Sequence, residues 1–177
     1  MKNLRQYGSA IAFLLLTSIL FFASPFPAPA AGESVNVQFD IAKAGPRAIE
    51  PLTEARVLRD YRAAWSSLAW AEQSNTLDPL EGPFVASAKK WLSETISHQR
   101  QSGLSTHYSE QSHNLQAVFY APEGDVIELH DTAQFHVQVF DGSKVIRDEP
   151  VTEHYVVLMT PGADRWVIRQ LQSVAHF

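Results

Sequence analysis

The side chain best suited to chemistry is Asp131, a carboxylate inside an otherwise apolar alternation. Strict alternation places Asp131 on the same face of a strand as Leu129 and Ala133. A carboxylate that points inward is hydrogen-bonded, paired with a cation, or shifted towards its neutral form. In a pocket such a group can serve as a general base, with His154 or Tyr155 as its partner.

A structural interpretation of Asp131 competes with the catalytic one. A β-bulge at His130-Asp131 would turn the carboxylate outward, and bulges are common where long strands bend. We favour the bulge, because the spacing of the sequence fixes no second catalytic group beside Asp131. The sequence also has no serine in a nucleophile-elbow context and no glycine-rich phosphate loop. A small cofactor-free hydrolase, isomerase or dehydratase is therefore the second functional hypothesis.

Seven histidines raise the question of a metal site. No pair of them has the helical i, i+4 or short-loop spacing of zinc ligands. His130 and His136 would lie ~20 Å apart along one strand, which is too far to share an ion. A tight turn at Asp141-Gly142 would bring His154 near His130, but two histidines are an incomplete ligand set. We expect no metal and no cofactor.

The amino-terminal segment resembles a secretory signal peptide over residues 1–31. Lys2 and Arg5 form a basic start, and Ile11–Ala23 is an apolar run of 13 residues, shorter than the ~20 that span a bilayer. Small residues around Ala30-Ala31 suit cleavage. We therefore expect an extracytoplasmic protein, periplasmic or secreted, that does not contact the membrane after cleavage. A retained amino-terminal anchor is the alternative.

Composition narrows the classes of partner. Removing residues 1–31 leaves 12 basic and 19 acidic side chains, a net charge of −7 with histidine neutral. This balance argues against nucleic acid as a partner. The chain has no cysteine, which excludes disulfides, thiolate nucleophiles and cysteine-bound metals.

Two stretches of helical periodicity come before a change of period near Gly103. The first, from about Thr53 to Gln73, has an apolar stripe that Glu72 continues. A turn-rich connector follows, with a short helical turn at Asp78-Pro79. The second helix spans about Phe84–Gln101 and is expected to bury Phe84, Ala88, Trp91, Leu92 and Thr95. Gly103 suits a left-handed residue after its end.

Strand periodicity dominates the rest of the chain, in segments 107–120, 126–140, 151–160 and 165–174. The pattern predicts an α+β domain over 51–177, with two to three helices packed in the concave face of a curved four-stranded antiparallel sheet. Residues 32–50 form either an extended linker or an extra edge strand, because Ser34–Ile41 alternates cleanly.

The order of elements resembles the nuclear transport factor 2-like cone. It is most similar to the IMS domain of chloroplast and cyanobacterial division proteins of the J-domain type. The matching segments are Tyr61-Arg-Ala-Ala-Trp65, Leu80-Glu-Gly-Pro-Phe84, Trp91, Gln101-Ser-Gly103, Leu115-Gln-Ala-Val118 and Gly162-Ala-Asp-Arg-Trp166-Val-Ile168. The resemblance implies a non-enzymatic module whose cone binds the tail of a partner protein. We take from this resemblance only the type of module, and we do not infer a role in division.

The leading hypothesis is an exported, non-catalytic domain that binds a protein or peptide tail or a small apolar ligand. Helices across a curved sheet leave an opening at one end, and such pockets are mostly apolar. The candidate contact residues are aromatic: Tyr61, Trp65, Trp70, Phe84, Trp91, Phe135 and Tyr155. Trp70 lies off the apolar stripe and is the best candidate for an exposed protein contact. A homodimer through the polar sheet face of Glu128–Gln138 is a further expectation.

Overall fold

The computed structural model describes residues 35–177, and the expected signal peptide lies outside them. One five-stranded sheet and two α-helices make up this part of the chain. Their order is β1 (Asn36–Asp40), α1 (Pro51–Ser74), the 3-10 turn η1 (Asp78–Leu80), α2 (Ala86–Gln101), β2 (Leu104–Tyr120), β3 (Ile127–Asp141), β4 (Lys144–Pro161) and β5 (Trp166–Val174). The α+β class and the order of elements are confirmed.

The sheet has the strand order β1-β2-β3-β4-β5. The strands β2 to β5 form the expected antiparallel meander. The strand β1 adds to it in parallel, with Val37 opposite His113. The sheet is therefore mixed and five-stranded, so the expected four-stranded antiparallel sheet was incomplete. Of the two alternatives for residues 32–50, the edge strand is the one observed.

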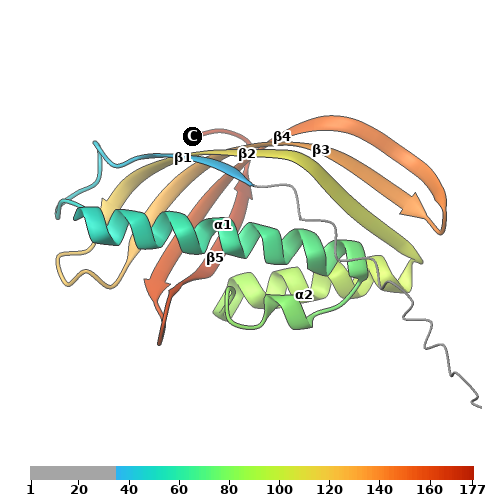
Figure 1. Cartoon of the computed structure of the whole chain (residues 1–177), viewed down its shortest axis with the longest axis horizontal. Coiled ribbons are helices and arrows are strands. Elements are labelled where there is room, and N and C mark those ends of the chain that lie inside the picture. The colour runs from blue at the N-terminus through green and yellow to red at the C-terminus, as the bar shows by residue number, and fades with distance from the viewer. Residues whose placement is uncertain (1–34) are drawn as a thin grey trace, which may run out of the picture. The chain divides into compact units, whose positions relative to one another are not determined.

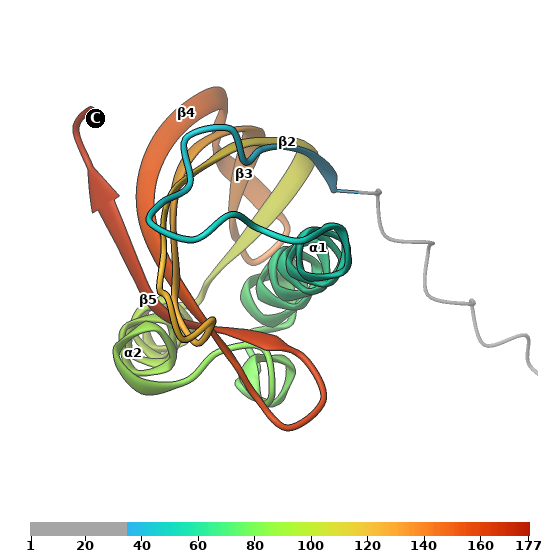
Figure 2. The ribbon, with the colours of Figure 1, turned by 90° about the vertical axis from the view of Figure 1, so that its left-hand side faces the viewer.

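The helix α1 lies across the concave side of the sheet (Figures 1 and 2). It buries the stripe that the sequence indicated, including Val57, Tyr61, Trp65 and Leu68. Glu72 continues the stripe and is only 6% exposed. The spacing of apolar residues thus decides which face of α1 meets the sheet.

The helix α2 packs beside β5 at the same concave side (Figure 2). Its buried residues are Ala88, Leu92 and Ile96. Trp91, expected in the buried stripe, is 41% exposed. That expectation was wrong because Ala88, Leu92 and Ile96, at i, i+4 and i+8, define a narrower stripe that excludes the adjacent Trp91. Gly103 has φ of 72° just after the helix, as predicted.

The long strands β3 and β4 form a hairpin that reaches the end of the domain where α1 and α2 both terminate (Figure 1). The strand β5 pairs only with His154–Pro161 of β4. Among the described residues, the outer edge of β4 over 144–153 has no strand partner. The sequence predicted this strand over 151–160 only, but β4 begins at Lys144 and continues to pair with β3 across a register shift between Val139 and Phe140.

Candidate functional site

Asp131 points into the domain and is fully buried. It lies opposite Leu115 on β2 and Tyr155 on β4, in continuous register on both sides. The irregularities of β3 pairing lie elsewhere, between Ala117/Phe119, Ser109/Ser112 and Val139/Phe140. The favoured bulge at His130-Asp131 was therefore wrong, and strict alternation gave the correct orientation.

Two side chains hold the Asp131 carboxylate. The Tyr61 hydroxyl donates to Asp131 Oδ2 at 2.6 Å, and His113 Nδ1 lies 2.7 Å from the same oxygen. Burial and the Asp131 carboxylate together raise the pKa of Tyr61 well above its ordinary value, so its phenol stays a hydrogen-bond donor. We call Tyr61, His113 and Asp131 the inner cluster.

The helical period of α1 and the alternation of β2 explain why the inner-cluster side chains point inward. Tyr61 lies on the buried stripe of α1, while His113 lies two residues before Leu115 on the inward face of β2. Two polar atoms of the inner cluster, Asp131 Oδ1 and His113 Nε2, have no hydrogen-bond partner among the described residues. A buried imidazole with a carboxylate on Nδ1 and a free Nε2 is the arrangement of an oriented base.

Aromatic rings close the inner cluster off from the end of the domain. The ring centroid of Trp65 lies 4.4 Å from that of His113. The same indole lies 5.5 Å from Tyr155 and 6.4 Å from Phe135. These rings separate the inner cluster from the space beyond them.

That space is a cavity of about 240 Å³ at the end where the helices terminate. We call it the end pocket. Its apolar part comes mainly from β3 and β4, and its polar part from both helices, β2 and β4. The lining residues are Glu72, Thr95, Gln99, Thr106, Tyr108, Phe135, Val137, Val139, Arg147, Val151, Glu153 and Tyr155.

Glu72 is the most perturbed acid of the end pocket. Burial raises the pKa of its carboxyl to about 7, and the hydrogen bond from the Tyr108 hydroxyl opposes this increase only in part. Burial and Glu72 in turn raise the pKa of Tyr108 well above its ordinary value. Glu72 therefore changes charge near neutral pH at the wall of an open cavity.

Most of the other polar side chains of the end pocket already have partners. Gln99 donates to the Glu72 backbone carbonyl and accepts from the Thr106 hydroxyl, at 2.8 and 2.6 Å. Arg147 binds Glu149 through Nε at 2.6 Å. Glu153 accepts from Ser173 at 3.0 Å. Among the lining residues only Arg147 is cationic, and Glu149 neutralises it.

The structure divides the predicted contact residues into three groups. Phe135 and Tyr155 line the end pocket. Tyr61 and Trp65 lie behind them, in the core. Phe84 is buried where the connector meets β5, through a bridge to Ile168. Trp70 and Trp91 lie on the surface, at 55% and 41% exposure.

The proposed catalytic partners of Asp131 were misplaced. His154 lies opposite Thr132 and contacts its hydroxyl at 3.2 Å. Tyr155 is opposite Asp131 in register, but the groups bonded to the carboxylate are Tyr61 and His113. Sequence reasoning missed His113, Glu72 and Tyr108 as site residues. Two of them could have been found from the sequence, because the strand alternation places His113 on the inward face and the helical stripe places Glu72 there.

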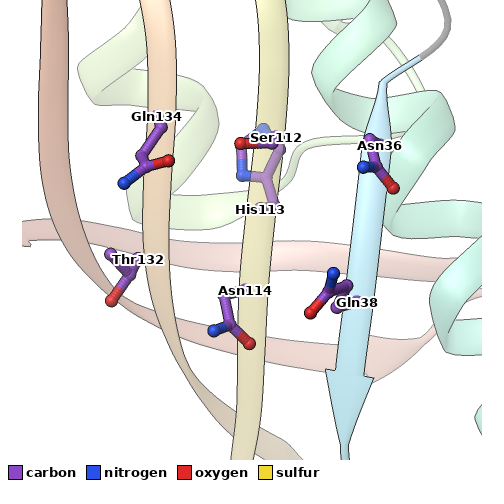
Figure 3. A pocket seen from close by; sticks show the side chains of 7 residues that line it. All are labelled: Asn36, Gln38, Ser112, His113, Asn114, Thr132 and Gln134. Atoms are coloured by element: carbon purple, nitrogen blue, oxygen red, sulfur yellow. The ribbon is translucent and has the colours of Figure 1, made fainter.

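A second, shallow pocket lies over β1, β2 and β3 on the opposite face of the sheet (Figure 3). Its surface is made of amides and hydroxyls, and the His113 side chain beneath it is fully buried. This is the polar face expected to pair two copies, and that pairing stays a prediction. The lining is Asn36, Gln38, Ser112, His113, Asn114, Thr132 and Gln134.

Within residues 35–177, no group of three or more potential metal ligands converges. Neither helix of this part of the chain combines the length and the apolar character needed to span a bilayer.

The comparison with solved structures identifies the architecture. The intermembrane space region of chloroplast protein ARC6 superposes with a TM-score of 0.59 at 13% identity, covering 73% of this chain and 99% of that one. The chain has the cone fold of the nuclear transport factor 2-like proteins. The resemblance inferred from the sequence is confirmed at the level of the fold.

Two further cone structures match with lower scores. A putative scytalone dehydratase from Novosphingobium aromaticivorans has a TM-score of 0.43 at 13% identity, covering 70% of this chain and 85% of that one. ActVI-ORFA from Streptomyces coelicolor has a TM-score of 0.42 at 14% identity, covering 68% and 95%. No family model matches the sequence, and no curated protein is significantly similar to it.

Proposed function

We propose that this cone is a binding module that takes an extended segment of a partner protein into the end pocket. The observation that carries the proposal is the end pocket itself, an open cavity whose wall includes the apolar residues Phe135, Val137, Val139 and Val151. Apolar cavities with a few convergent polar groups are typical ligand sites.

The strand β4 supports an extended ligand in particular. Its outer edge over 144–153 has no strand partner among the described residues, and three of these residues line the end pocket: Arg147, Val151 and Glu153. A peptide alongside this edge would gain main-chain hydrogen bonds, and alternate side chains would enter the pocket. Pro150 lacks an amide hydrogen, so it limits the pairing to the parts of the edge on either side.

A random ten-residue peptide library panned against the protein tests this proposal. Val139→Trp fills the end pocket, whereas Leu52→Trp adds a bulky ring at an exposed position at the start of α1, outside both the pocket and the edge of β4. We expect selected peptides to bind wild type and Leu52→Trp equally and Val139→Trp at least tenfold more weakly. Peptides that bind all three proteins equally would contradict the proposal.

We propose further that the module works outside the cytoplasm. The support is the signal-like pattern of residues 1–31 in the sequence. Cell fractionation followed by amino-terminal sequencing tests this, with a mature start near Ala31 as the expected result. A full-length cytoplasmic product would overturn it.

Acid-base catalysis at the inner cluster is the second candidate function. The observation that favours it is His113, whose Nδ1 faces Asp131 while Nε2 has no partner among the described residues. The His113 side chain is fully buried and contacts the Trp65 ring, so a substrate would have to displace core side chains to reach Nε2. Diethyl pyrocarbonate separates the two functions: a binding module leaves His113 unmodified while the exposed His98 reacts. Modification of both at similar rates would favour the enzyme.

A further inference from the structure

We infer that the end pocket selects a partner segment that carries a lysine, whose ammonium group it receives between aromatic rings and the Glu72 and Glu153 carboxylates. This inference rests on the proposed function and names the chemistry of its ligand. Each part of it comes from the lining of the end pocket.

Three aromatic rings line the end pocket. The Tyr108 and Phe135 centroids are 5.1 Å apart in an edge-to-face arrangement, and Tyr155 also borders the cavity. Ring faces attract ammonium groups through their negative quadrupole, and the attraction grows when the cation is desolvated. The four-carbon stem of lysine would cover the valines of the wall.

The charges around the pocket favour a cation over an anion. Glu72 and Glu153 line the cavity with only hydroxyl partners, from Tyr108 and Ser173 respectively. The sole lining cation, Arg147, is bound to Glu149. An incoming ammonium would therefore meet two carboxylates without a cationic partner, whereas an incoming carboxylate would meet repulsion.

Glu72 gives the interaction a dependence on pH. Its pKa of about 7 means that the carboxyl is mostly neutral at pH 6 and mostly ionised at pH 8. The charged or titratable groups around it are Tyr108 on β2 and Arg147, Glu153 and Tyr155 on β4. Both phenols have raised pKa values and stay neutral in this range. Lysine affinity should therefore rise with pH as Glu72 ionises.

Two matched probes test the inference by NMR titration of the protein. Nα-acetyl-lysine N-methylamide carries the ammonium, and Nα-acetyl-norleucine N-methylamide has the same carbon stem without it. At pH 8 we expect the lysine probe to bind at least tenfold more tightly than the norleucine probe. We expect this ratio to fall at least threefold at pH 6.

The variant Glu72→Gln, titrated with the same two probes, tests the role of the Glu72 carboxylate. It should reduce the lysine-to-norleucine ratio at pH 8 at least fivefold, remove its pH dependence, and leave norleucine binding unchanged. The matched control Glu94→Gln, on the exposed side of α2, should leave all these values as in wild type.

The outcomes separate this inference from the proposed function. Equal or tighter binding of norleucine would overturn the lysine preference while leaving a working apolar pocket. A wild-type ratio that Glu72→Gln does not change would overturn the role of Glu72. If neither probe binds and the panned peptides ignore Val139→Trp, both the inference and the proposed function fail.

Discussion

The inner cluster and the end pocket each contain an inward-facing carboxyl group that accepts a hydrogen bond from a tyrosine. The surroundings of the two carboxyl groups differ. Asp131 has two partners on one oxygen and is walled in by aromatic rings. Glu72 has one tyrosine and borders a cavity. The comparison teaches that inward orientation alone does not make a carboxylate a site. Contact with an open cavity distinguishes a group that can bind a ligand from one that holds the fold together.

The largest expected effect comes from breaking the inner cluster. Asp131→Ala leaves the Tyr61 hydroxyl and His113 Nδ1 buried without their acceptor, and two such unsatisfied groups together cost about 2–6 kcal/mol. We expect the free energy of unfolding to fall by that amount in urea denaturation.

The variant Asp131→Asn tests whether the loss of stability comes from losing the hydrogen-bond acceptor. Both contacts use the single oxygen Oδ2, which an amide oxygen can replace, so we expect a smaller loss than for alanine. The control Glu94→Ala removes an exposed carboxylate from α2 and should leave stability unchanged. If Asp131→Ala is as stable as wild type, the inner cluster does not hold the fold.

The next effect is the pH dependence of stability caused by Glu72. Its folded pKa is raised from 4.5 to about 7, so the folded state retains a proton that the unfolded chain has lost between these values. Stability should therefore fall as pH rises from 4.5 to 7, by about 3 kcal/mol at ~1.36 kcal/mol per pKa unit.

Glu72→Gln should remove this contribution, and comparing denaturation of the two proteins at pH 5 and pH 8 isolates it from the other titrating groups. Glu94→Gln serves as the exposed control. Identical pH dependence of stability in wild type and Glu72→Gln would show that the pKa of Glu72 is not raised. The end pocket would then not differ from the inner cluster in the way described above.

The smallest effect is expected at the surface tryptophan of α1. Trp70 is 55% exposed, so Trp70→Ala should change the free energy of unfolding by no more than about 0.5 kcal/mol. It should also leave the affinity of panned peptides unchanged, because Trp70 does not line the end pocket. A tenfold loss of peptide affinity would place the contact surface on α1 and not in the pocket.

Much of the fold could be predicted because the helical period and the strand alternation in the sequence indicate which residues face the core. The stripe of α1 and the alternation around Leu129 and Ala133 fixed which faces meet. The sequence could not place β1, because each of its residues pairs with a residue of β2 that lies 76 positions later in the chain, as Asn36 does with Ser112 (112 − 36 = 76). Trp91 was misjudged because its neighbours Ala88, Leu92 and Ile96 bury a narrower stripe.

The candidate site was harder to predict than the fold. The alternation that turns Asp131 inward was present in the sequence, but its partners come from α1 and β2. Neither partner lies near Asp131 along the chain, so only the packing of three elements identifies Tyr61 and His113. The end pocket likewise depends on where α1 and α2 stop relative to the β3–β4 hairpin, which no local pattern encodes.

Chemical-shift mapping with the lysine and norleucine amides tests the central claim most directly. We predict that the backbone amide shifts concentrate at Glu72, Tyr108, Val137 and Val151 around the end pocket, while Tyr61, His113 and Asp131 stay unchanged. Shifts concentrated at His113 and Asp131 would contradict the account, because the enclosed region would then be the binding site.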